Sequence, residues 1–200
     1  MSRTVLVAGA TGRLGRALVA ALAAEGHQVQ PLSDGAPAMA SPAGVEVVSL
    51  AFEDPDTFDT ALAGIDGLFL AASPQDAQAA ARLAPVLQMA QMAGVRHIVL
   101  VSAAGAGQDG RSPLGALERA LMDSGVHYTI LRPHWLADDS GGVLHAGRVR
   151  ASSGNGKTGS TSIRNLAQAA AAAFLERRYD TEYNLNGAKH ARASQPMGLL

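Results

Sequence analysis

The sequence predicts an α/β protein of the doubly wound type, in which a parallel sheet carries helices on both faces. Short apolar runs alternate with helical patterns along most of the chain, and a glycine follows most of the helical patterns. The apolar runs are continuous, which is typical of parallel strands that are buried on both faces. Repeated strand-helix-strand units with right-handed crossovers then fold into a doubly wound sheet.

The expected strands and helices follow one another in a regular order. We expect strands at residues 4–8, 27–32, 45–50, 67–72, 97–102 and 127–131, because each range is a short apolar run. We expect helices at residues 14–25, 55–63, 74–93 and 114–124, because apolar residues recur there at helical spacing and a glycine comes after each range. The sixth strand ends at Arg132 and Pro133.

The pattern is looser after Pro133. We expect a strand at residues 143–151, a Gly/Ser-rich loop at 152–161, a helix at 162–178 and a short strand at 183–186. No linker is long enough to separate two domains. Residues 1–187 are therefore predicted to form one domain, with the segments of the substrate cleft at 133–187, and residues 188–200 are expected to be a frayed tail.

Composition narrows the class of protein. The chain has 200 residues, of which 48% are hydrophobic and 16% are charged, with a formal net charge of -1. Such a chain can bury a sizeable core and is too apolar to be disordered. It contains no cysteine, which excludes a disulfide framework and a cysteine nucleophile and favours a reducing cytoplasm.

Charge and hydropathy also bear on the partners. No run of Lys and Arg tracks a nucleic-acid backbone, so no nucleic acid is expected. The apolar stretches are far shorter than the ~20 residues of a membrane span, so no membrane is expected either. The six histidines show no H-x-x-x-H pair, and we predict no metal site.

A glycine-rich turn lies between the first strand and the first helix. Its sequence is Gly9-Ala10-Thr11-Gly12-Arg13-Leu14-Gly15. The first glycine permits a tight turn, the second lets the backbone approach a pyrophosphate, and the third lets the helix pack closely on the strand. The N-terminus of the helix offers N–H groups and a positive dipole to the phosphates. This pattern predicts a dinucleotide site that includes Gly9, Thr11, Gly12, Arg13, Leu14 and Gly15.

Several segments together resemble a known family. They are VLVAGATGRLGRALVAALAAEGHQV, GIDGLFLAAS, AGVRHIVLVSAAGA, ERALMDSGVHYTILRPHWL and SIRNLAQAAAAAFL. In this order they resemble the atypical short-chain dehydrogenase/reductase group, the NmrA-like and NAD(P)H-binding proteins that include NADPH-dependent quinone reductases. The resemblance runs from Val5 to about Gly187 and implies a Rossmann fold and a nicotinamide dinucleotide. It places the following residues at the cofactor: Ala71, Ala72, Ser102, Arg132 and Pro133.

The same resemblance places a substrate cleft after the sixth strand, lined by His134 and Trp135. Each of these residues also has a structural interpretation. Arg132 is either part of the cleft or a structural charge at the end of a strand. His134 either donates a proton or orients a carbonyl, or it is structural. Trp135 either packs in the fold or stacks on a ring.

The sequence departs from standard short-chain dehydrogenases in its catalytic residues. Those enzymes use Tyr-x-x-x-Lys, and here Tyr128 is followed four residues later by Arg132. The paired serines of the family appear as Ser102-Ala103, so Ser102 is either a functional hydroxyl or a turn serine. A usual carbonyl reductase is therefore disfavoured. A quinone-like acceptor is compatible with the loss, since it can accept hydride directly and take its protons from water.

Two residues give opposite indications for the choice between NAD and NADP. Asp34 follows the second strand, where an acid binds the ribose 2′-OH and repels a 2′-phosphate. Arg13 lies in the glycine-rich turn, from which a side chain can reach the adenosine ribose. We therefore expect NAD or NADP as the cofactor, and Asp34 favours NAD. Asp34 precedes Gly35, however, and is also a candidate for a solvated turn.

Two functions follow from these observations. The first is an NAD(P)H-dependent oxidoreductase that acts on a quinone-like or other small carbonyl acceptor. The second is a non-catalytic, NmrA-like redox sensor, which the missing Tyr-Lys pair would suit. The short chain after Asn186 also suits a sensor, unless a homo-oligomer supplies a lid from a neighbouring subunit.

Overall fold

Within the described residues, seven strands form the central sheet. They are β1 (Thr4–Val7), β2 (Gln28–Ser33), β3 (Val48–Ser49), β4 (Gly67–Ala71), β5 (His97–Val101), β6 (His127–Pro133) and β9 (Thr181–Leu185). The computed structural model describes residues 4–10, 12–26, 28–33, 48–49, 57–73, 76–109, 112–134, 136–137 and 161–185. A separate parallel pair consists of β7 (Leu136–Ala137) and β8 (Thr161–Ser162).

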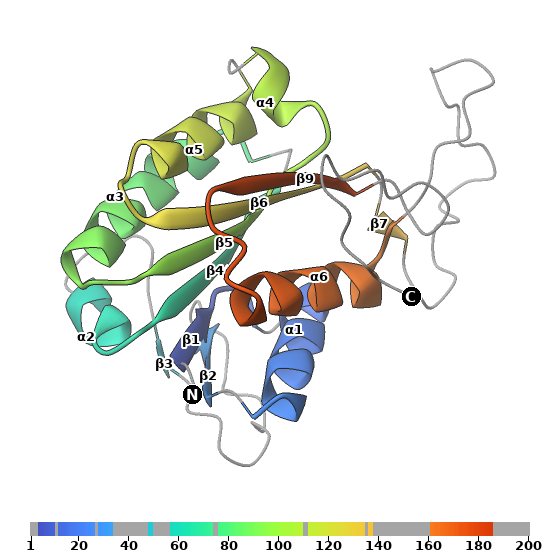
Figure 1. The fold of residues 1–200 in the computed structure, drawn as a ribbon. Coiled ribbons are helices and arrows are strands. Elements are labelled where there is room, and N and C mark those ends of the chain that lie inside the picture. The colour runs from blue at the N-terminus through green and yellow to red at the C-terminus, as the bar shows by residue number, and fades with distance from the viewer. Residues whose placement is uncertain are drawn as a thin grey trace.

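The sheet is parallel throughout and has the strand order β3-β2-β1-β4-β5-β6-β9 (Figure 1). The chain runs outward from β1 to β3 and then returns to β4 on the other side of β1. The strand order therefore reverses between β1 and β4. In open α/β sheets, ligands bind outside the carboxyl ends of the strands at such a reversal. The predicted doubly wound α/β fold is confirmed.

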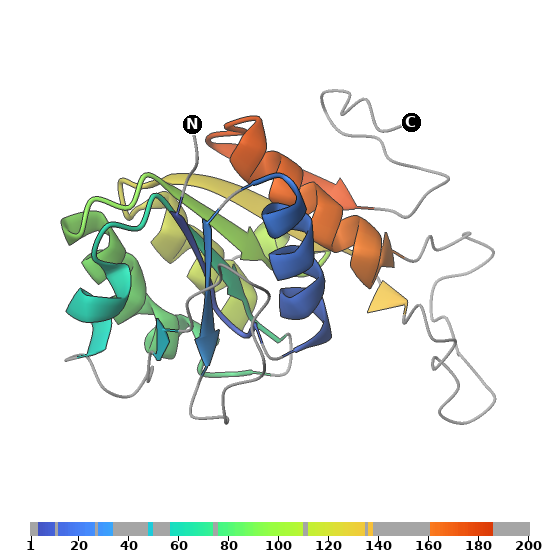
Figure 2. The same cartoon turned by 90° about the horizontal axis from the view of Figure 1, so that it is seen from below.

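Helices cover both faces of the sheet. They are α1 (Arg13–Ala24), α2 (Phe58–Leu62), α3 (Ala79–Met92), α4 (Ala106–Asp109), α5 (Pro113–Met122) and α6 (Ile163–Leu175). One apolar core lies between the sheet and α2, α3 and α5, and a second lies between the sheet and the pair α1 and α6 (Figure 2). The short α4 lies beyond the end of β5, next to α5 (Figure 1).

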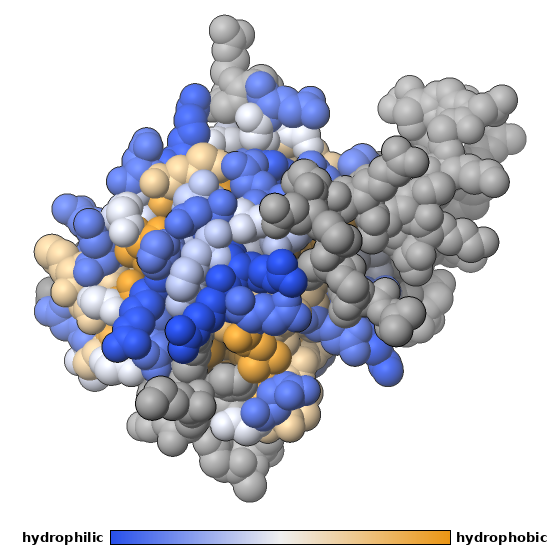
Figure 3. All heavy atoms as spheres, viewed as in Figure 1, coloured by the Kyte–Doolittle hydropathy of each residue, from blue (hydrophilic) through white to orange (hydrophobic). Residues whose placement is uncertain are grey.

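Small side chains bring α6 close to its neighbours. Its buried face is largely alanine, and α6 packs along α1. Near its end, the ring of Phe174 fills the space above Gly67 on β4, where an added Cβ would lie 2.8 Å from the ring. The surface in Figure 3 is mostly hydrophilic over the described residues, and their large exposed hydrophobic side chains are Met92 and Leu175.

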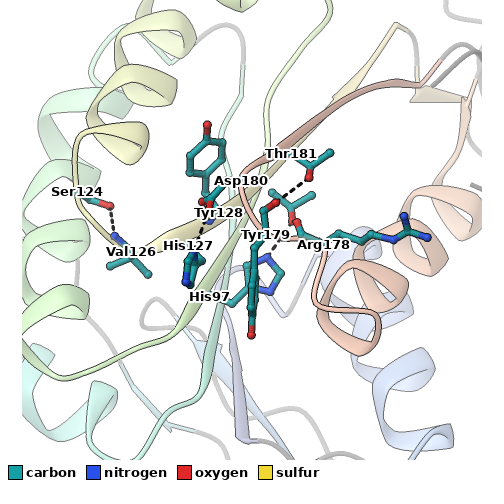
Figure 4. A network of polar contacts seen from close by, with 10 residues as sticks. His97, Ser124, Val126, His127, Tyr128, Arg178, Tyr179, Asp180 and Thr181 are labelled. Atoms are coloured by element: carbon teal, nitrogen blue, oxygen red, sulfur yellow. Dashed lines mark hydrogen bonds and ion pairs between the residues drawn. The ribbon is translucent and has the colours of Figure 1, made fainter. Parts of the chain in front are cut away.

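A polar network joins the amino-terminal ends of β5, β6 and β9 (Figure 4). Nε2 of the buried His97 lies 2.8 Å from the hydroxyl of Thr129, which donates to the carbonyl of Arg178. The imidazole of His127 stacks on Tyr179 and lies 2.9 Å from the carboxylate of Asp180. These contacts attach the edge strand β9 to β6.

Most element boundaries agree with the sequence predictions to within a few residues. The helix predicted from residue 74 begins only at Ala79, because Asp76 forms a turn in which its carboxylate accepts from the N–H of Gln78. Pro85 lies inside that helix on the exposed side. Neither α4 nor the β7-β8 pair was predicted, since both are too short to show a period. The predicted strand at 143–151 and the tail at 188–200 lie outside the described residues.

Candidate functional site

The glycine-rich turn has the backbone geometry that its sequence predicts. Gly9 has a φ of 71°, in the left-handed region that favours glycine. Its carbonyl accepts a hydrogen bond of 2.9 Å from the N–H of Gly12, which closes the turn. Helix α1 then begins at Arg13. The chain thus reverses directly from the carboxyl end of β1 into the first helix.

Two of the three glycines allow close approaches of the backbone. A Cβ added to Gly15 would lie 2.3 Å from the carbonyl oxygen of Gly9 and 2.6 Å from Cα of Ala10. A Cβ on Gly12 would lie 3.2 Å from the same oxygen. Because the atoms around Gly15 are backbone, they cannot rotate away. Gly15 therefore holds α1 directly against the turn, as the packing role of the third glycine requires.

Helix α1 has no side-chain cap, a feature that it shares with α2 and α3 but not with α5 and α6. Ser112 and Ser162 cap those two helices, each accepting from a backbone N–H three residues on. At α1 the cap residue is Gly12, no side chain caps the helix, and the first turn has no acidic residue. Helix geometry leaves the first N–H groups without partners inside the helix, and together with the dipole they favour an anion. This arrangement fits a pyrophosphate.

The other predicted cofactor residues lie along the same edge of the sheet. Because all strands are parallel, the residues that end β4, β5 and β6 share the edge with the glycine-rich turn. The N–H of Ala72 donates to Val101 at 3.4 Å, and the N–H of Ser102 donates to Leu131 at 2.9 Å. Ala71 is exposed and Ala72 is half-buried. Their small side chains leave this part of the edge open to a ligand.

Ser102 stands at the end of β5 with a buried side chain. It is 4% exposed, and its Oγ makes no hydrogen bond to any of the described residues. Buried hydroxyls in native proteins normally have a partner. A ligand group at this edge of the sheet would satisfy the hydroxyl, which favours the functional interpretation of Ser102 over the turn serine.

Arg132 is held by two glutamates. Its guanidinium makes two parallel bonds to Glu118, of 2.9 and 2.7 Å, and Oε2 of Glu182 lies 2.6 Å from the same terminal nitrogen. The hydrogen bonds to Glu118 raise the pKa of Arg132, although burial opposes this. The sequence left open whether Arg132 lines the cleft or serves the structure. Its contacts are those of the structural role.

Among the described tyrosines, Tyr128 is the one that the sequence analysis compared with the usual Tyr-Lys pattern. Tyr128 is near the start of β6, at the edge of the sheet opposite the glycine-rich turn. Burial, with the carboxylates of Glu182 and Asp180, raises the pKa of Tyr128. A tyrosine that acts as a proton donor and acceptor in catalysis needs the opposite shift. Both lysines, Lys157 and Lys189, lie outside the described residues.

The last predicted residues are only partly described. Pro133 is buried, and its carbonyl accepts from Ala104 at 3.1 Å. His134 is exposed beyond the end of β6, and its N–H donates to Leu185. Thr11, Asp34 and Trp135 lie outside the described residues.

The sequence analysis missed Glu118, which α5 buries to 1% exposure. A signal for it was present. Glu118 follows Leu114 and Leu117 on the buried stripe of α5 and precedes Leu121. A carboxylate on an apolar stripe needs a buried cation, and in this structure that cation is Arg132.

The described segments were searched for metal sites and for helices that could span a membrane. No group of three or more His, Asp or Glu side chains in those segments is placed to hold a metal ion. None of their helices is long and apolar enough to cross a membrane.

Comparison with known proteins agrees with the site. The model of the NAD(P)H-binding family matches residues 9–177. A (4-alkanoyl-5-oxo-2,5-dihydrofuran-3-yl)methyl phosphate reductase of Streptomyces griseus is 33% identical over 184 residues, which cover 85% of this chain and 62% of that protein. Quinone oxidoreductase 2 of Escherichia coli is 30% identical over 202 residues, which cover 92% of this chain and 68% of that protein. The chain thus spans less than two thirds of the length of the Streptomyces relative.

Solved structures share the fold. The triphenylmethane reductase of Citrobacter sp., complexed with NADP(H), has a TM-score of 0.72 at 24% identity, covering 93% of this chain and 70% of that chain. The quinone oxidoreductase QOR2 of Escherichia coli, complexed with NADPH, has a TM-score of 0.69 at 23% identity, covering 92% and 69%. The sequence match over most of the chain and the glycine-rich turn lead to one conclusion. The chain belongs to the NAD(P)H-binding family of the atypical short-chain dehydrogenase/reductase group.

Proposed function

We propose that the protein is an NAD(P)H-dependent reductase of a quinone-like or other small carbonyl acceptor, working without a Tyr-Lys pair. The observation that carries the proposal is the glycine-rich turn, where Gly15 brings α1 against the carbonyl of Gly9 and the helix begins without a capping side chain. The family of the chain agrees with it. When bound, the reduced nicotinamide ring supplies the hydride.

The residues at the edge of the sheet divide the work of binding. The N–H groups in the first turn of α1 hold the pyrophosphate. The small side chains of Ala71 and Ala72 leave room for the body of the cofactor. In this proposal the Oγ of Ser102 donates to a carbonyl oxygen of the nicotinamide or of the acceptor, and Pro133 and His134 border the acceptor after β6.

A quinone-like acceptor suits the side chains that are present. Tyr128, with its raised pKa, lies at the opposite edge and cannot protonate a carbonyl at this site. An electron-poor quinone needs no such donor, because water supplies the one proton that completes the hydroquinone after the hydride has been accepted. Arg132 is already neutralised by Glu118 and Glu182, so it does not serve as a binding residue for an anionic acceptor. The Escherichia coli relative is named a quinone oxidoreductase.

The cofactor preference depends on two opposed features. Asp34 favours NADH, as the sequence predicts. The first turn of α1 favours the 2′-phosphate of NADPH, since it carries Arg13 and Arg16 and no acid. The two solved relatives described above were complexed with NADP(H) and NADPH. Dissociation constants for both cofactors, in the wild type and in Asp34→Arg, decide which feature dominates: tighter NADPH binding in the variant identifies Asp34 as the residue that reads the ribose.

A redox sensor without turnover is the second candidate, and one observation favours it. No described residue at the carboxyl edge is a tyrosine with a lysine beside it, and the structure commits Arg132 to an ion pair. A sensor needs the cofactor site alone. Both candidates therefore require cofactor binding, and only the reductase requires turnover.

Steady-state oxidation of NADH and NADPH in the presence of a benzoquinone tests the proposal. Binding is measured in parallel by thermal unfolding. A ligand at 100 times its Kd adds ~2.7 kcal/mol to the free energy of unfolding, and each kcal/mol raises the Tm of a protein of this size by ~2–4 °C. Binding with turnover supports the reductase. Binding without turnover of any quinone supports the sensor, and no binding rejects both. Size-exclusion chromatography of the same sample tests the expected homo-oligomer.

A further inference from the structure

A buried ion pair lies beside the segment that follows β5. Nε of Arg132 is 2.9 Å from Oε1 of Glu118, and Nη2 is 2.7 Å from Oε2. Arg132 is 8% exposed and Glu118 is 1% exposed. Two parallel bonds to one carboxylate fix both the position and the plane of the guanidinium.

A second carboxylate shares the same guanidinium nitrogen. Oε2 of Glu182, on β9, lies 2.6 Å from Nη2 of Arg132. The guanidinium therefore joins three elements, β6, α5 and β9. A buried ion pair contributes little net stability, because removing the charges from water offsets most of their attraction. The pair therefore contributes a fixed position of the guanidinium more than it contributes stability.

The backbone of α4 lies directly on this pair. A Cβ added to Gly107 would lie 2.5 Å from Nη2 of Arg132 and 2.8 Å from Oε2 of Glu118. Carbon atoms in ordinary contact are about 3.5 Å apart, so any side chain here would displace α4 or the guanidinium by about 1 Å. Glycine disfavours a helix relative to alanine. Its presence in α4 is explained by the close approach to the ion pair.

The segment from Ser102 to α4 is therefore held from two sides. On one side, the N–H groups of Ser102 and Ala104 donate to the carbonyls of Leu131 and Pro133, at 2.9 and 3.1 Å. On the other side, α4 rests on the guanidinium through Gly107. This segment carries the buried hydroxyl of Ser102, which makes no hydrogen bond to any described residue.

We propose that Arg132, held by Glu118, is a positioning residue that sets the place of the segment from Ser102 to α4 beside the cofactor. The inference rests on the proposed reductase function. Arg132 touches neither cofactor nor acceptor in this proposal. It acts through Gly107 and α4 on Ser102, and so determines where the Ser102 hydroxyl stands relative to the reacting carbonyl.

The test compares Gly107→Ala with Gln108→Ala. Both substitutions are in α4 at exposed residues, but only alanine at position 107 would place a Cβ against the ion pair. Gly107→Ala is expected to lower kcat about 10- to 100-fold, since a displacement of ~1 Å at reacting groups costs up to ~100-fold. The Kd of the reduced cofactor should stay within about threefold of wild type, because the glycine-rich turn is untouched. Gln108→Ala should match wild type in both quantities.

Hydrogen exchange of the peptide that spans residues 102–109 gives a readout that does not depend on turnover. The amides of Ser102 and Ala104 should exchange faster in Gly107→Ala than in Gln108→Ala. If the wild type binds cofactor but reduces no quinone, the proposed function fails, and this exchange measurement alone decides the inference. An unchanged kcat together with unchanged exchange in Gly107→Ala would overturn it.

A second variant keeps the test informative if Gly107→Ala does not fold. Arg132→Lys retains the positive charge but cannot make two parallel bonds to Glu118. It should show the same fall in kcat and the same faster exchange, with the cofactor Kd unchanged. Wild-type kcat and exchange in Arg132→Lys would mean that only the charge is needed and that Arg132 does not position the segment.

Discussion

The two edges of the sheet differ in what their buried polar side chains contact. At the amino edge, His97, Thr129 and the carbonyl of Arg178 form a continuous chain of hydrogen bonds (Figure 4). At the carboxyl edge, the hydroxyl of Ser102 is buried without a partner among the described residues, and α1 begins without a capping side chain. Because buried polar groups normally find partners, the hydroxyl of Ser102 points to a ligand at the carboxyl edge.

We infer that the amino edge of the sheet contributes to stability and that the carboxyl edge binds the ligand. The side chains of the amino edge attach the last strand β9 to β6. At the carboxyl edge, the buried hydroxyl of Ser102 has no partner among the described residues, and a cofactor can satisfy it. Substitutions at the amino edge should therefore change the free energy of unfolding and leave cofactor affinity unchanged. Substitutions of the carboxyl-edge residues that contact the cofactor in the proposed function should do the reverse, with one exception.

The exception is Gly15, where fold and binding share one contact. In Gly15→Ala, Cβ would meet the backbone of Gly9 at 2.3 Å, so α1 must move away from the turn. We expect a loss of about 2–3 kcal/mol in stability from this overpacking, and a fall in cofactor affinity of at least ~30-fold. Thermal unfolding and cofactor titration measure the two effects. Ala20→Gly is the control. Ala20 is exposed on α1, and glycine there destabilises the helix by ~1 kcal/mol without touching the turn. An equal loss of cofactor affinity in both variants would contradict the prediction.

Thr129→Val breaks the amino edge. The hydroxyl of Thr129 joins the buried His97 to the carbonyl of the half-buried Arg178, and valine removes this partner from both. We expect a loss of about 2–3 kcal/mol in stability and no change in the cofactor Kd. Thr181→Val, whose hydroxyl bonds only to the nearby Tyr179 carbonyl, should cost less. A cofactor affinity that falls together with stability in Thr129→Val would show that the edges are coupled.

Ser102→Ala tests the carboxyl edge with a smaller effect. Because its Oγ makes no hydrogen bond to the described residues, its removal should leave the Tm unchanged or slightly raised. One hydrogen bond to a ligand is worth ~0.5–1.5 kcal/mol, so cofactor affinity or kcat should fall about 3- to 10-fold. Ser124→Ala is the matched control at the other edge, where the hydroxyl donates to Leu121 at 2.7 Å. It should lower the Tm and leave binding intact.

Sequence alone predicted what depends on local backbone geometry. The turn at Gly9 and the close approach at Gly15 follow from spacing, because each glycine acts on atoms within a few residues. The ion pair of Arg132 was not predicted, since its partners come from α5 and β9, far along the chain. A glutamate on the apolar stripe of α5 indicates a buried cation, but the sequence does not show which cation it is. The short α4 gave no period, and its role is visible only where Gly107 meets the guanidinium.

Asp180→Asn should have the smallest effect on stability. It tests whether the charge of Asp180 or the backbone conformation at this residue stabilises the amino edge. The carboxylate of Asp180 pairs with His127, but both side chains are about half exposed, at 52% and 55%. Exposed pairs contribute about 0–1 kcal/mol. Asp180 also has a φ of 52° and accepts from the N–H of Tyr128. Asparagine tolerates the left-handed conformation and keeps an acceptor, so we expect the Tm to change by less than about 2 °C.

Asp180→Ala completes this test, because alanine loses the charge, the acceptor and the tolerance of a positive φ together. We expect it to cost about 1–2 kcal/mol, measured by urea unfolding. If Asp180→Asn costs as much as Asp180→Ala, the ion pair with His127 carries the contact, and the edge should then weaken in high salt. If only Asp180→Ala is destabilised, the turn before β9 is held by backbone geometry, and the exposed pair is incidental to the attachment of that strand.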